Sequence, residues 1–176
     1  DSIYIFNNDH GFNIGMRKIT ISTSGIVPGI NRLRKLELQL GLAISLNAPN
    51  NELRNRLMPV NKKYPLEVLL DSVKKYINST GRRVTFEYVL MKDINDSLNL
   101  AEQLVDLLKN INCHINLIPI NPVSELDIKR PSSEKINKFK SILEKNNMNV
   151  TIRQEKGVNI KAACGQLRSS RDKRRG

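Results

Sequence analysis

The stretch "PLEVLLDSVKKYINSTGRRVTFEYVL", residues 65–90, joins an amphipathic helix directly to a strand and decides the fold class. Apolar side chains recur at helical spacing through its first half, at Leu66, Leu69, Leu70, Val73, Tyr76 and Ile77. Pro65 suits the first turn of such a helix, and Gly81 suits its end. The β-branched and aromatic run 84–90 then predicts a buried strand.

The same alternation continues on both sides of this unit. Further apolar runs predict strands covered on both faces, at 18–22, 42–46, 114–120 and 149–153. Helices are expected over about 97–110 and 132–146, with shorter ones after Pro28 and Asn51. Alternation of this kind indicates an α/β protein with a parallel sheet. Four or five strand–helix units predict either an open doubly wound sheet or a partial barrel. In both, the functional residues lie at the carboxyl ends of the strands.

Composition narrows the class of protein. The 176 residues are 39% hydrophobic and 26% charged, as in a globular domain. The 29 Lys and Arg residues outnumber the 17 Asp and Glu residues, which fits a polyanionic partner such as nucleic acid, or simply a lysine-rich surface. Scarce aromatic residues, 5% with no Trp, disfavour stacking platforms for single strands. With no apolar run of membrane-span length and no signal peptide, we expect a soluble protein of a reducing compartment.

The two cysteines differ in context. Cys113 and Cys164 form no C-x-x-C pair, and with His10 and His114 as the only histidines we predict no metal site in this chain. Cys113 precedes a predicted strand and is interpreted as structural. Cys164 follows two alanines and precedes Gly165, so a bulky substrate has room to approach the sulfur. By itself, a cysteine beside alanines is more often a small buried hydrophobe than a nucleophile.

Polar residues stand where the first two strands end. Ser22 opens the segment "STSGIVPG", which suits a polar ligand or an ordinary turn. Ser45 and Asn47 point the same way from an alternating strand, with Leu46 opposite. Such a pair suits a ribose or an amino-acid head group, while Asn47 alone equally suits the local backbone.

Two further polar residues belong to later strands. Asn121 ends a strand between Pro119 and Pro122, which fix its direction, and an amide there suits an adenosine. Glu87 lies inside a strand, facing a barrel interior or an active mouth. A structural carboxylate paired with an arginine is the more common arrangement.

Five segments, taken in order, closely resemble the RlmN/Cfr family of radical-SAM RNA methyltransferases. They are "GFNIGMRKITISTSGIVPGI", "LAISLNAPNNELRNRLMPVNKKYP", "GRRVTFEYVLMKDINDS", "CHINLIPINP" and "AACGQL", and they extend from Gly11 to Leu167. The resemblance implies a partial parallel (βα) barrel of the radical-SAM type over 1–167, incomplete at its amino-terminal side. A basic tail, 168–176, would follow, either contacting RNA phosphates or frayed in solvent.

The resemblance also implies an activity, namely methylation of C2 of an adenine in 23S rRNA and in certain tRNAs. In this family a cysteine of "AACGQL" accepts a methyl group from one S-adenosylmethionine. A second S-adenosylmethionine is cleaved at a four-iron, four-sulfur cluster to start radical transfer to the adenine. Cys164 matches that cysteine. The positions matching the family's S-adenosylmethionine site are Ser22, Ser45, Leu46, Asn47 and Asn121.

The chain departs from the family pattern in several places. Asn47 stands where the family usually has histidine, and Lys161 replaces a common aspartate. The family's cluster-binding C-x-x-x-C-x-x-C, its G-E-P motif and its second catalytic cysteine have no counterpart in the sequence. We therefore expect a fragment that is inactive alone, from a cytoplasmic and monomeric enzyme with an external electron donor. Two alternatives are a Cfr-type adenine-C8 methyltransferase and a non-catalytic RNA- or nucleotide-binding remnant.

Overall fold

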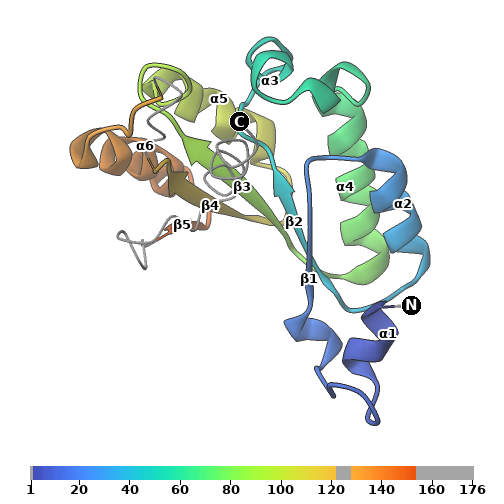
Figure 1. Cartoon of the computed structure of the whole chain (residues 1–176). Helices are drawn as coiled ribbons and strands as arrows, with labels where there is room; N and C mark the ends of the chain where they lie inside the picture. Colours follow the sequence, from blue (N-terminus) through green and yellow to red (C-terminus); the bar gives the residue numbers. More distant parts are fainter. Residues whose placement is uncertain (1, 122–127, 154–176) are drawn as a thin grey trace, which may run out of the picture.

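The computed structural model describes residues 2–121 and 128–153. A single parallel sheet runs through this part of the chain in the order β1-β2-β3-β4-β5 (Figure 1). Its strands are β1 (Thr20–Thr23), β2 (Gly41–Ser45), β3 (Val84–Leu90), β4 (Cys113–Pro119) and β5 (Val150–Ile152). The helices are α1 (Ser2–Asn7), η1 (Met16–Lys18), α2 (Val27–Lys35), α3 (Asn51–Leu57), η2 (Pro59–Lys62), α4 (Leu66–Thr80), α5 (Leu98–Leu108) and α6 (Ser133–Lys145).

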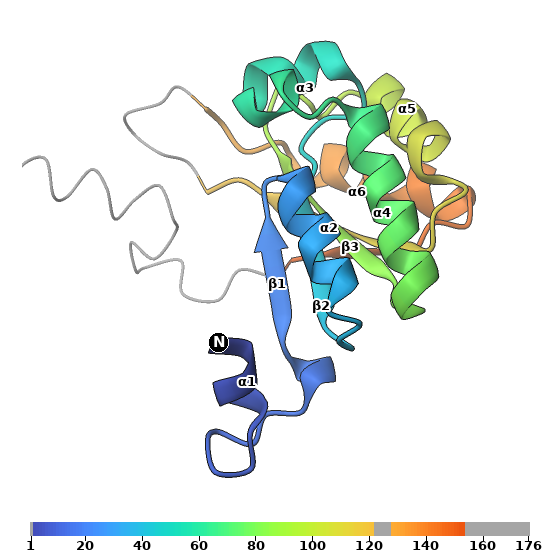
Figure 2. The same cartoon turned by 90° about the vertical axis from the view of Figure 1, so that its right-hand side faces the viewer.

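The strand order distinguishes a barrel from a doubly wound sheet. Each strand pairs with the strand that follows it in the sequence. Because crossovers between parallel strands share one hand, such an order places every crossover helix on the same face. One hydrophobic core joins residues of α2, α4, α5 and α6 to that face, and Figure 2 shows α2 and α4 standing beside each other over it. This arrangement confirms the partial parallel barrel.

The sheet therefore has one packed face and one open face. In β3, Val84, Phe86, Tyr88 and Leu90 are fully buried in the core, while the residues between them are half-buried. β4 alternates in the same way. The prediction that the strands are covered on both faces is wrong for β3 and β4 in the described chain, because the helices of a singly wound sheet cover only one face.

Local sequence signals end the elements as expected. Gly81 ends α4 in the left-handed region (φ +66°), which favours glycine. The side chains of Ser97 and Ser132 accept hydrogen bonds from the backbones of α5 and α6 and cap their amino termini.

Cys113 is the first residue of β4 and is buried, which raises the pKa of its thiol to about 11. Within the described residues, none of the helices has the length and apolarity needed to cross a bilayer.

Candidate functional site

The first two strands bring two predicted site residues to the open face. Ser22 is exposed in β1, and Ser45 is half-buried at the end of β2. In the parallel register Ser22 lies beside Ala43, whereas Ser45 lies beside Glu87. Ser22 is therefore one row below Ser45, on the same face of the sheet.

A polar row crosses the open face at the level of Ser45. The register pairs Ser45 with Glu87, Glu87 with Asn116, and Asn116 with Thr151. The Thr151 hydroxyl donates to Asn116 Oδ1 (3.4 Å) and also meets His114 Nε2 (2.9 Å). Sequence reasoning did not predict this row, because the relative register of strands distant in the chain cannot be read from any one of them.

Glu87 differs from its sequence-based interpretation. The carboxylate is half-buried on the open face, and within residues 2–121 and 128–153 it forms no ion pair. The predicted pairing with an arginine is therefore not found in the described chain.

Leu46 faces the opposite way from Ser45. Its side chain is fully buried in the hydrophobic core. Its backbone N–H donates to the carbonyl of Glu87 (2.9 Å), and its carbonyl accepts from Arg54 Nε (3.1 Å). Leu46 thus fixes the end of β2 between β3 and α3.

The side chain of Asn47 is bonded to neighbouring segments. Asn47 adopts a left-handed conformation (φ +60°), which asparagine tolerates better than most residues. Its Oδ1 accepts from the backbone N–H of Val89 (2.9 Å), and its Nδ2 lies 3.3 Å from the sulfur of Met58. Of the two roles that the sequence left open for Asn47, the structure contains the bonding to local backbone, and the cofactor role stays a prediction.

A buried arginine lies beneath these strand ends. Arg54 of α3 has no solvent exposure, and its guanidinium donates to the carbonyls of Ser24 (2.9 Å), Ser45 (3.2 Å) and Leu46 (3.1 Å). A fourth bond goes to Oδ1 of Asn61 (2.8 Å). Burial lowers the pKa of Arg54 to about 10, so the side chain is still a cation at neutral pH. Sequence reasoning missed Arg54, because nothing in the spacing of α3 separates a buried arginine from an exposed one.

Gly25 makes room for this arginine. Its backbone is left-handed (φ +105°), and a Cβ there would lie 3.0 Å from Arg54 Nη2. The loop after β1 can therefore approach the guanidinium closely only with glycine at this position.

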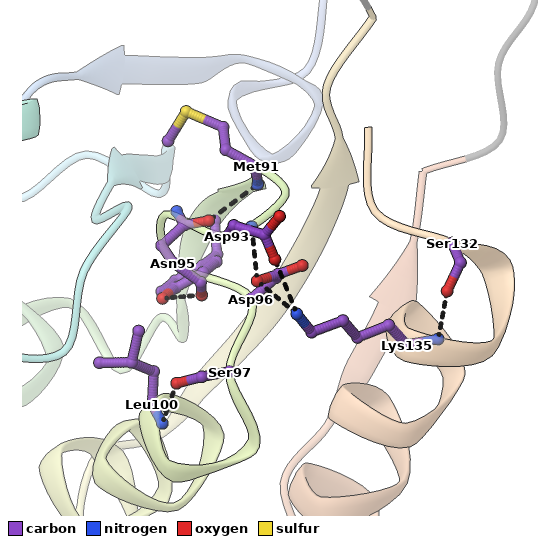
Figure 3. A network of polar contacts seen from close by, with 9 residues as sticks. Met91, Asp93, Asn95, Asp96, Ser97, Leu100, Ser132 and Lys135 are labelled. Carbon is purple, nitrogen blue, oxygen red and sulfur yellow. Dashed lines mark hydrogen bonds and ion pairs between the residues drawn. The ribbon is translucent and has the colours of Figure 1, made fainter. Parts of the chain in front are cut away.

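The end of β3 is held by a second polar network, drawn in Figure 3. Asn95 is fully buried, accepts from the backbone N–H of Met91 (2.8 Å) and donates to the carbonyls of Val89 (2.7 Å) and Asn47 (2.9 Å). Tyr88 adds a hydrogen bond from its hydroxyl to the Asn95 carbonyl (2.9 Å). Asn95 thereby fixes the ends of β2 and β3 relative to each other.

The remaining predicted residues are less constrained. Asn121 is exposed just after β4, five positions beyond Asn116, so it does not share a register row with Ser22 or Ser45. Cys164, Lys161 and the tail 168–176 lie outside the described residues, and the predictions about them stay predictions.

The described residues suit an organic ligand better than a metal ion. Over 2–121 and 128–153, no group of three or more His, Cys, Asp or Glu side chains is arranged to hold a metal. The described residues therefore contain no set of side chains that could bind the four-iron, four-sulfur cluster. The open face, by contrast, presents the hydroxyl of Ser45, the carboxylate of Glu87 and the amide of Asn116 side by side.

Comparison with known proteins gives consistent results. No family model matches the chain. It is 52% identical over 167 residues to a protein of Lachnospira eligens and 54% identical over 167 residues to one of Natranaerobius thermophilus, each named "Probable dual-specificity RNA methyltransferase RlmN". A protein of the same name from Bacillus subtilis is 52% identical over 165 residues. These matches cover 94–95% of the chain and 46–48% of the relatives, so the chain spans about half their length.

Solved structures agree with this result. A radical SAM methyltransferase from Sphaerobacter thermophilus superposes with a TM-score of 0.90 at 48% identity, over 93% of the chain and 48% of that structure. A domain of pyruvate-formate lyase-activating enzyme from Bacteroides vulgatus shares the fold, with a TM-score of 0.60 at 15% identity over 77% of the chain and 80% of that domain. By sequence, almost the whole chain is therefore similar to about half the length of proteins named RlmN, and by sequence and fold it is similar to about half of a radical SAM methyltransferase.

Proposed function

We propose that the chain is part of an enzyme that methylates C2 of adenine in 23S rRNA and in certain tRNAs, with Cys164 as the methyl carrier. The observation that carries the proposal is the similarity of 52–55% along almost the whole chain to proteins named as dual-specificity RNA methyltransferases. The formal charge of +12 supports a polyanionic substrate. A cytoplasmic, monomeric enzyme with an external electron donor and no membrane partner is part of the same proposal.

The described residues suggest how the cofactor would be held. S-adenosylmethionine supplies the methyl group when bound, and Ser22, Ser45 and Asn121 are the side chains at the strand ends that would contact it. Leu46 and Asn47 would shape the site through the backbone, since their side chains are occupied elsewhere. The four-iron, four-sulfur cluster needs ligands that this chain does not carry, and the fragment alone is expected to be inactive.

The chemistry favours a sulfur carrier. C2 of adenine is not nucleophilic, so it does not take a methyl group by direct displacement. A cysteine thiolate is strongly nucleophilic and polarizable and can accept the methyl carbon first. In the proposed reaction Cys164 accepts this carbon and delivers it to the adenine ring, and its alanine and glycine neighbours leave space on both sides of the sulfur.

Replacing Cys164 tests this proposal directly. In the complete gene product, expressed in cells that lack their own adenine-C2 methyltransferase, Cys164→Ala should abolish 2-methyladenosine in digested 23S rRNA and tRNA, as measured by mass spectrometry. Peptide mapping of the parent protein should find a methylated Cys164. The matched control is Cys113→Ala, which removes the other cysteine and should keep the modification. Unchanged C2 methylation in Cys164→Ala would remove this residue from the mechanism, and methylation at C8 instead of C2 would contradict the proposed regiochemistry.

A further inference from the structure

The open face carries a carboxylate whose charge no described residue neutralises. Glu87 is half-buried, and its carboxylate makes no hydrogen bond or ion pair within residues 2–121 and 128–153. The contrast with Asp96 is informative, because that nearly buried carboxylate is paired with Lys135 at 3.0 Å. Partly removing a charge from water costs free energy when the charge has no partner. We therefore expect the Glu87 carboxylate to have a partner from outside the described chain.

Two hydrogen-bonding groups flank this carboxylate. Ser45 and Asn116 are its register neighbours on β2 and β4, at the spacing of adjacent strands, about 5 Å. Oδ1 of Asn116 accepts from Thr151, and neither its Nδ2 nor the Ser45 hydroxyl bonds to another residue of the described chain. A negative charge is thus set between two groups that can donate hydrogen bonds to a ligand.

The packing of the sheet leaves this row accessible from one side. The neighbours of Glu87 along β3, Phe86 and Tyr88, are fully buried under the helices, so Glu87 points to the opposite face. The described helices cover only the Phe86 and Tyr88 side. A ligand at this row would meet a carboxylate first, which disfavours an RNA phosphate and favours a cation.

We propose that Glu87, flanked by Ser45 and Asn116, is a ligand-binding residue that selects a positively charged adenosyl compound over its neutral counterpart. The inference rests on the proposed function, which names S-adenosylmethionine as the cofactor. S-adenosylmethionine carries a sulfonium cation, whereas S-adenosylhomocysteine has a neutral thioether and is otherwise the same except for the methyl group. A fixed carboxylate attracts the first more than the second, and it keeps product from competing with cofactor.

Equilibrium dialysis with both compounds tests this selection. The complete gene product is compared with Glu87→Gln, which keeps the shape of the side chain and removes its charge. We expect Glu87→Gln to lower the affinity for S-adenosylmethionine about tenfold and that for S-adenosylhomocysteine much less, as for the loss of a charge-assisted contact. The matched control is Glu102→Gln, at an exposed position of α5, which makes the same change in net charge and should leave both affinities unchanged.

The outcomes separate the inference from the proposed function. An equal loss for both ligands, or no loss, in Glu87→Gln overturns the inference, whatever the methylation assay shows. A selective loss supports it even where C2 methylation is absent, a result that would count against the proposed reaction alone. Urea unfolding of Glu87→Gln should match the parent protein, and a large loss of stability would show that Glu87 is a structural residue instead.

Discussion

At the scale of single residues, the fully buried side chain of Arg54 binds backbone carbonyls at the ends of two strands. Arg54 has no solvent exposure and bonds to the carbonyls of Ser24, Ser45 and Leu46, at the ends of β1 and β2. Ser24 and Leu46 lie just beyond their strands and Ser45 is the last residue of β2, so a side-chain donor satisfies carbonyls at the edge of the regular sheet. Arg54 thereby sets the spacing of the two strand ends that carry Ser22 and Ser45.

Removing the guanidinium of Arg54 should therefore destabilise the folded protein. Arg54→Met leaves buried carbonyls without donors, and we expect the free energy of unfolding to fall by about 3–5 kcal/mol. Arg54→Lys keeps the cation but not the fork of donors and should lose part of that amount. Urea denaturation of the 176-residue chain measures both.

The control for Arg54 lies in the same helix. Arg56 of α3 is exposed, and Arg56→Met should change the free energy of unfolding by no more than about 0.5 kcal/mol. Equal losses for the two methionine variants would contradict the structural role given to Arg54.

At the scale of elements, one lysine ties α6 to the loop between β3 and α5. Lys135 Nζ pairs with Oδ1 of Asp96 (3.0 Å) and with Asp93 (3.5 Å). Figure 3 shows the lysine side chain reaching from α6 toward the two aspartates. The Asp96 side chain is only 3% exposed, and its Oδ2 has no hydrogen-bond partner in the described chain. Its Oδ1 accepts a hydrogen bond from the backbone N–H of Asp93 (3.0 Å), while its cationic partner Lys135 is about forty positions away in the sequence.

Removing the charge of Lys135 should weaken the contact between α6 and the loop that precedes α5. Lys135→Met leaves the Asp96 carboxylate buried without a cation, and we expect a loss of about 1–3 kcal/mol in the free energy of unfolding. The same substitution at Lys138, whose pair with Glu134 is on the surface of α6, should cost less than about 0.5 kcal/mol.

A double variant checks the mechanism. Lys135→Met combined with Asp96→Asn should be more stable than Lys135→Met alone, because the unpaired charge is gone. A double variant that is less stable than the single one would assign the effect to packing of the lysine stem instead.

At the scale of the whole molecule, burial of acidic groups makes stability sensitive to alkali. Burial raises the pKa of Cys113 to about 11 and also raises the pKa values of Tyr76 and Tyr88. In each case the unfolded chain releases its proton at lower pH than the folded protein. The folded state then binds more protons, so the free energy of unfolding falls as pH rises through this range.

Cys113 supplies the first part of this loss. Its ordinary pKa of 9.0 is reached before those of the tyrosines, so we expect the free energy of unfolding to fall by about 1 kcal/mol from this group between pH 8 and 10. Urea denaturation at both pH values should show a smaller fall for Cys113→Ala than for the parent protein. Identical falls would mean that the thiol is accessible in the folded state.

Much of the fold could be predicted from the sequence. Helical spacing and β-branched runs are local properties, and α4, α5 and α6 begin and end within about two residues of their predicted bounds. The choice between a doubly wound sheet and a partial barrel was not local, because it depends on which strands become neighbours. The resemblance to a family suggested the barrel, and the strand order established it.

The sequence by itself determined the order of elements, the class of fold and the positions of Ser22 and Ser45 at strand ends, since each follows from the period and boundaries of one segment. Only the tertiary structure decided which polar groups have partners. It bonds Asn47 to Val89 and buries Arg54 among carbonyls, and within residues 2–121 and 128–153 it leaves Glu87 unpaired between Ser45 and Asn116. The physical reason is that hydrogen bonds and desolvation depend on segments brought together from distant parts of the chain. A local sequence pattern does not show which segments come into contact.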